Sequence, residues 1–199
     1  MDLYRTSEIA DRFADGVRTL VAKGKPDTQS KPDTQGKPDT QGKPVAITEF
    51  GAATYRGAGD AGAHARDIVE WNEVTGEPVR LKGRYVRDEA GQAAYLRELL
   101  DVFDAEGVDS AFVFTFALHG FPHRPDADPR DDLDLASYGI VKVLEDGHGQ
   151  TYPDMAWEPK AAFRLLAERQ GPSRQGWATT RAPLSMGRND NRIPGRFQD

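Results

Sequence analysis

The sequence has no cysteine among its 199 residues, which excludes disulfides and any metal site built from thiolates. It has no apolar run near the roughly 20 residues that a membrane-spanning helix needs. The segment 1–5 lacks the basic and apolar regions of a signal peptide. We therefore expect a cytoplasmic chain without a membrane partner. The net charge of −6 gives no reason to expect a nucleic-acid partner either.

A hexapeptide repeat interrupts an otherwise globular composition, in which 38% of residues are hydrophobic and 29% are charged. Residues 25–42 hold three copies of Lys-Pro-Asp-Thr-Gln followed by Ser or Gly. The unit has no apolar side chain to bury, so ordering it would cost entropy that nothing offsets. We predict a disordered surface insertion at 25–42. A disordered tail is predicted at 171–199, where hydrophobic periodicity is lost.

Hydrophobic periodicity predicts three helices and two buried strands in alternation. Apolar residues recur at helical spacing over about 7–23, 88–106 and 157–170. Two short apolar runs, 45–49 and 110–116, are typical of buried strands. Alternating helices and strands predict the α/β class with a parallel sheet.

The long connection 52–87 is rich in glycine and charge, and we expect it to be a binding loop or disordered. Within it, Pro78–Leu81 is a candidate for a short extended piece. Trp71-Asn72-Glu73 contains an Asn-Glu pair, but we expect it to follow no strand and to be exposed to solvent.

The first predicted strand ends in Thr48-Glu49-Phe50-Gly51, which places a carboxylate where the strand stops at a glycine. Chemistry in parallel α/β folds is found at the carboxyl ends of the strands. Glu49 is therefore the leading candidate for a functional residue.

That ending resembles the seventh strand of the large clan of (β/α)8 glycoside hydrolases. Passages 107–116, 134–141 and 152–163 also fit the end of such a barrel. The stretch from 4 to 170 looks like helix six, strand seven, helix seven, strand eight and helix eight. More closely, these passages are similar to bacterial proteins that carry the name abortive infection protein.

The resemblance implies a partial (β/α)8 (TIM) barrel. Helix six would lie within 1–24, and strands seven and eight with their helices within 43–170. Glu49 would be the nucleophile of a retaining mechanism. The resemblance covers none of strands one to six, and the fourth of these would supply the Asn-Glu acid/base.

The function expected from this resemblance is a glycoside-hydrolase-like barrel fragment with a carbohydrate partner, inactive alone. It would need the missing N-terminal part of the barrel or self-association to cover its open strands. A non-enzymatic phage-defence or interaction protein is the alternative, and a degenerate gene product without function is a third reading. The residues leave open whether the chain is an enzyme.

Four aromatic residues are candidates for substrate binding, because aromatic rings stack on sugars. They are Phe114, Phe116, Tyr55 and Trp71. Phe114, Phe116 and Phe121 would form a sugar-stacking platform at the end of the second predicted strand. Phe112, Phe114 and Phe116 alternate to one face, which a packed barrel core would equally require.

His119 and His123 lie among aspartates in the connection 117–136 and raise the question of a metal site. Two histidines four residues apart converge only on a helix, and Gly120 and Pro122 argue against one. We predict a solvated acidic loop, with no metal and no cofactor.

Overall fold

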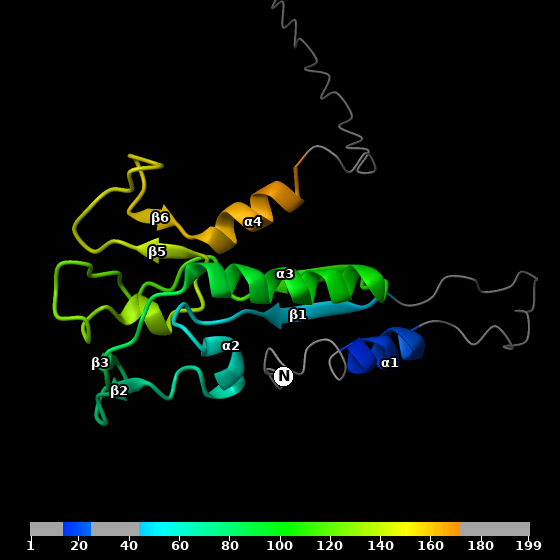
Figure 1. The fold of residues 1–199 in the computed structure, drawn as a ribbon, viewed down its shortest axis with the longest axis horizontal. Coiled ribbons are helices and arrows are strands. Elements are labelled where there is room, and N and C mark those ends of the chain that lie inside the picture. Colours follow the sequence, from blue (N-terminus) through cyan, green and yellow to red (C-terminus); the bar gives the residue numbers. More distant parts are fainter. Residues whose placement is uncertain (1–13, 25–43, 172–199) are drawn as a thin grey trace, which may run out of the picture. The chain divides into compact units, whose positions relative to one another are not determined.

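The computed structural model describes residues 14–24 and 44–171 (Figure 1). The predicted insertion at 25–42, nearly all of the predicted tail and the start of the first predicted helix lie outside these residues. The chain divides into two units, Met1–Arg169 and Gln170–Asp199, and every element below belongs to the first.

The described residues form a mixed α/β structure, as the sequence predicts, with three sheets of two strands each. No closed barrel is formed within these ranges. The elements are α1 (Ala14–Gly24), β1 (Ala46–Phe50), α2 (Ala58–Ala61), the 3-10 helix η3 (Gly62–His64), β2 (Val69–Trp71), β3 (Pro78–Leu81), α3 (Glu89–Ala105), β4 (Ser110–Val113), the 3-10 helix η4 (Leu133–Ala136), β5 (Val141–Val143), β6 (Trp157–Pro159) and α4 (Ala161–Arg169).

Strands β1 and β4 pair in parallel and are connected through α3, which confirms the predicted β/α alternation. Ile47 pairs with Ala111 and Phe50 with Val113, and the register shifts between these two pairs. Because β1 extends to Phe50, Glu49 lies inside the strand, one residue before its end. Strand β4 stops at Val113, which is shorter than the predicted 110–116.

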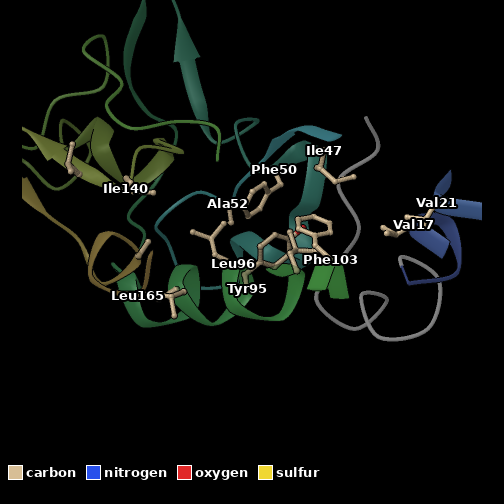
Figure 2. Close-up of a cluster of buried hydrophobic side chains, with 14 residues drawn as sticks. Val17, Val21, Ile47, Phe50, Ala52, Tyr95, Leu96, Phe103, Ile140 and Leu165 are labelled. Atoms are coloured by element: carbon tan, nitrogen blue, oxygen red, sulfur yellow. The ribbon is translucent and has the colours of Figure 1, made fainter. Parts of the chain in front are cut away.

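Helix α3 has the predicted ends and the predicted apolar stripe. The Asp88 side chain caps it by accepting a hydrogen bond from the backbone N–H of Gly91, at 2.8 Å. Gly107 follows the last turn with a φ of 71°, a conformation that favours glycine. Leu96 and Phe103 of the stripe are buried, and the Phe103 ring meets the Phe50 ring edge-on at 5.2 Å between centroids (Figure 2).

The connection 52–87 is ordered, so of the two alternatives expected for it, a binding loop or a disordered segment, the second is wrong. It contains α2, η3 and an antiparallel hairpin of β2 and β3, in which Val69 pairs with Leu81. Both of these side chains are buried in a second hydrophobic cluster. The predicted extended piece at Pro78–Leu81 is confirmed as β3.

The hairpin also corrects the prediction that Trp71-Asn72-Glu73 follows no strand, since Trp71 is the last residue of β2. The Asn72 side chain accepts hydrogen bonds from the backbone N–H groups of Val74 and Thr75. An asparagine that bonds to its own backbone in this way initiates a turn. Asn72 therefore shapes the hairpin, while Glu73 is exposed as predicted.

The last helix begins at Ala161 instead of 157, because Trp157–Pro159 forms β6 and pairs with β5. The ring of Pro159 disfavours a helical conformation in the residue before it, so this segment is extended. Trp157 nevertheless packs against Phe163 of α4, at 5.8 Å between ring centroids.

None of the described helices combines the length and the apolarity that a membrane-spanning segment requires.

Candidate functional site

Glu49 lies on the exposed face of the β1–β4 sheet. Ile47 and Phe50 are buried in the core cluster, whereas Glu49 is exposed. Within the described residues, its carboxylate forms no hydrogen bond or ion pair. Glu49 therefore has no structural partner there that would account for a carboxylate at this position.

Aromatic side chains of β4 share this exposed face. Val113 packs against the core, so Phe112 and Phe114 on either side of it point the other way, with 58% and 39% of their surfaces exposed. The register shifts between the pairs Ile47–Ala111 and Phe50–Val113, so Thr48 and Glu49 together lie across from Phe112. We call Glu49, Phe112 and Phe114 the Glu49 face.

At the end of β1 the backbone packs closely against Phe114 and Tyr138, so that Tyr138 lies next to the Glu49 face. The backbone N–H of Phe114 donates to the Phe50 carbonyl at 2.8 Å. A Cβ atom added to Gly51 would lie 3.9 Å from the Cβ of Tyr138. The rings of Phe114 and Tyr138 are 6.2 Å apart. Tyr138 thus stands directly beside the strand end that carries Glu49.

An arginine packs among three aromatic rings, one of which is Tyr138. The Arg66 guanidinium carbon is 4.4 Å from the ring centroid of Phe121, 5.7 Å from that of Trp71 and 5.6 Å from that of Tyr138. These distances are within the range of cation–π attraction. Burial lowers the pKa of Arg66, and its Nε atom has no hydrogen-bond partner. We call Arg66, Trp71, Phe121 and Tyr138 the arginine–aromatic cluster.

The structure places the four predicted binding aromatics in different surroundings. Phe114 belongs to the Glu49 face and Trp71 to the arginine–aromatic cluster. Phe116 instead meets Trp157 edge-on at 5.3 Å, in an aromatic group that packs on α4. Tyr55 is buried, with its ring 5.3 Å from that of Tyr85. Burial raises the pKa of Tyr55 to about 12, so it is an uncharged core residue and the geometry does not favour it as a sugar platform.

A buried ion pair holds the connections at this end of the sheet together. The Nζ atom of Lys160 lies 2.8 Å from Oδ1 of Asp134 and donates to the hydroxyl of Thr54 at 2.8 Å. Arg87 donates to Oδ2 of Asp134 at 2.7 Å. Lys160 and Asp134 are both fully buried, at 0% exposed. Burial lowers the pKa of Lys160, and the charge of Asp134 opposes that shift.

The connection 117–136 is not the solvated acidic loop that the sequence suggests. Asp132 is buried, accepts a hydrogen bond from Arg87 at 2.9 Å and lies 3.0 Å from Nδ1 of His123. Asp126 and Asp128 are exposed. The loop is structured because its inner carboxylates pair with cations from other segments. Among the described residues, no group of three or more His, Cys, Asp or Glu could hold a metal ion.

Asp132 is expected to make stability depend on acidity. Burial by itself would raise its pKa, but the hydrogen bond with His123 and the charge of Arg87 outweigh burial and lower the pKa to about 2. A depressed pKa stabilises the fold above the ordinary value of 3.8, and this stabilisation is lost as the pH falls toward 2. Urea unfolding should therefore show Asp132→Asn less stable than the unmodified chain at pH 7, with a difference that shrinks between pH 4 and pH 2. A difference that stays constant over this range would contradict the pairing.

The sequence pattern singles out Glu49 as a candidate, but it does not point to Arg66, Tyr138 or the buried ion pair. Asp134, Tyr138 and Lys160 occur in the passages that carry the barrel resemblance, so that signal was available for them. No sequence signal points to Arg66, because it lies in a connection without hydrophobic periodicity. Comparison of the chain with models of known protein families and with curated proteins finds no match.

Proposed function

We propose that the Glu49 face is the nucleophile side of a retaining glycoside-hydrolase-type site. The observation that carries the proposal is an exposed carboxylate near the end of a parallel strand, without a partner among the described residues, beside the exposed rings of Phe112 and Phe114. A retaining site needs one carboxylate that attacks the sugar and a second carboxyl group about 5 Å away that protonates the leaving group. Glu49 supplies the first, and a segment or chain that completes the barrel supplies the second.

The nucleophile can be tested without the acid/base, by using a sugar whose leaving group needs no proton. In a 2,4-dinitrophenyl 2-deoxy-2-fluoroglycoside, a Glu49 oxygen would bond to the anomeric carbon while the bond to dinitrophenolate breaks. The dinitrophenolate leaves as an anion with the electron pair of that bond, and fluorine slows hydrolysis of the glycosyl-enzyme ester.

We expect intact mass spectrometry to show one fluoroglycosyl group per chain, and peptide mapping to place it on Glu49. Glu49→Gln should give no adduct. Glu73→Gln is the matched control, since it removes an exposed glutamate after β2, and it should be labelled like the unmodified chain. A panel of gluco, galacto, manno and uronic acid reagents covers the common sugars. Absence of labelling with all of them, or labelling at another residue, would contradict the proposal.

The exposed sheet also favours a second candidate, a non-enzymatic interaction protein. In the described residues, β1 and β4 form a sheet of two strands, so each strand has an unpaired edge. Open edges and exposed phenylalanines are features that another polypeptide can cover. The labelling experiment separates the two functions, because a surface used only for docking has no reason to attack an anomeric carbon.

A further inference from the structure

Arg66 differs from the other partly buried arginines of the described residues in having no acidic partner. Each of those others contacts a carboxylate: Arg87, Arg124, Arg130 and Arg169. Arg66 meets three aromatic rings instead, and its Nε atom is buried without an acceptor.

Aromatic rings satisfy only part of what a partly buried guanidinium requires. The ring faces attract its charge, but they replace none of the hydrogen bonds that its N–H groups make in water. A guanidinium stays protonated in proteins and offers two parallel N–H groups that match a carboxylate. Because Arg66 is only partly buried, an anion from solution can reach its terminal amino groups, although not the buried Nε atom.

The position of Arg66 links this anion to the Glu49 face. Its guanidinium lies against Tyr138, whose ring is beside that of Phe114 and whose Cβ would be 3.9 Å from a Cβ atom added to Gly51. Tyr138 is therefore a shared neighbour of Arg66 and of the Glu49 face, and a ligand that extends from Phe114 past Tyr138 would approach the positive charge of Arg66.

We infer that the carbohydrate bound at the Glu49 face is a hexuronic acid, with Arg66 binding its carboxylate. The inference rests on the proposed function, because it names the sugar class of the same site. A singly charged carboxylate fits better than a doubly charged phosphate, since one guanidinium is available and the charge of Asp67 also acts on Tyr138 of the cluster. Because Nε is buried, the two terminal amino groups of Arg66 are the donors that remain for the ligand.

The test compares sugars that differ only at the sixth carbon. Calorimetry with the full chain would measure the affinity of methyl glucuronide against methyl glucoside, and of methyl galacturonide against methyl galactoside. We expect one uronide to bind about tenfold or more tightly than its neutral counterpart, because a hydrogen bond to a charged group is stronger than one between neutral groups. In Arg66→Met this ratio should fall to about one.

Two further variants separate binding from a merely structural role. Arg66→Lys retains the positive charge and should keep part of the preference for the uronide. Arg56→Met removes an exposed arginine from the same connection and should leave both affinities unchanged. A structural role for Arg66 would change the melting temperature without changing the ratio of the two affinities.

Failure of this inference is distinguishable from failure of the proposed function. Equal binding of uronide and neutral sugar, binding of neither, or a preference that survives in Arg66→Met overturns the inference. None of these results depends on whether the fluoroglycosides label Glu49. A preference for the uronide that depends on Arg66, with no labelling of Glu49, would instead leave a uronate-binding protein that is not a retaining hydrolase.

Discussion

Replacing Asp134 with alanine is expected to lower the free energy of unfolding by about 3–5 kcal/mol. Asp134 lies 2.8 Å from the Nζ atom of Lys160, and both residues are 0% exposed. Without Asp134 the ammonium group keeps only its hydrogen bond to the Thr54 hydroxyl. An unpaired charge in a protein interior is among the most destabilising changes that one substitution can produce.

Urea unfolding of the two proteins would measure this difference. Asp126→Ala is the matched control, because Asp126 is an exposed aspartate of the same connection, and it should change stability by less than about 0.5 kcal/mol. Replacing both members of the pair, as in Asp134→Leu with Lys160→Met, should recover part of the loss, since two apolar side chains leave no buried charge. A loss below about 1 kcal/mol in Asp134→Ala would show that solvent reaches Lys160.

Local sequence signals predict the central parallel unit well. The capping aspartate, the apolar stripe and the terminal glycine of α3 each act over one or two helical turns, so they can be read directly from the sequence. Strands β1 and β4 are short apolar runs with a helix between them, and their parallel pairing follows from that order. Glu49 could be chosen because it falls near the end of such a strand.

Features that depend on distant residues could not be predicted in this way. Thr54, Arg87, Asp134 and Lys160 come from four separate segments, and no periodic pattern links them. The sequence pattern predicts the start of a helix where β6 lies, because proline is tolerated in a first turn, whereas pairing with β5 keeps Trp157 extended. The role inferred for Arg66 likewise depends on rings at Trp71, Phe121 and Tyr138, which only the fold brings together.

Gly51→Ala is expected to destabilise the fold by about 3 kcal/mol, at the upper end of what overpacking costs. An added Cβ atom would lie far inside van der Waals distance of the Phe114 carbonyl oxygen and 3.3 Å from the carbonyl carbon. These are backbone atoms, and the backbone N–H of Phe114 is hydrogen-bonded to the Phe50 carbonyl. The carbonyl therefore cannot move aside without separating β1 from β4.

The same substitution should also slow labelling of Glu49 by the fluoroglycosides, because the strand that carries the carboxylate shifts against Phe112 and Phe114. Gly120→Ala is the control, since a Cβ atom there would meet nothing within 4 Å. It should be neutral or stabilising by up to about 1 kcal/mol, because alanine restricts the unfolded chain more than glycine does.

Urea unfolding would measure the stability of the two variants, and mass spectrometry would measure how fast each is labelled at Glu49. If Gly51→Ala were as stable as Gly120→Ala, the close contact between the end of β1 and Phe114 would not be part of the folded state. If it were destabilised but labelled at the normal rate, the position of Glu49 would not depend on that contact.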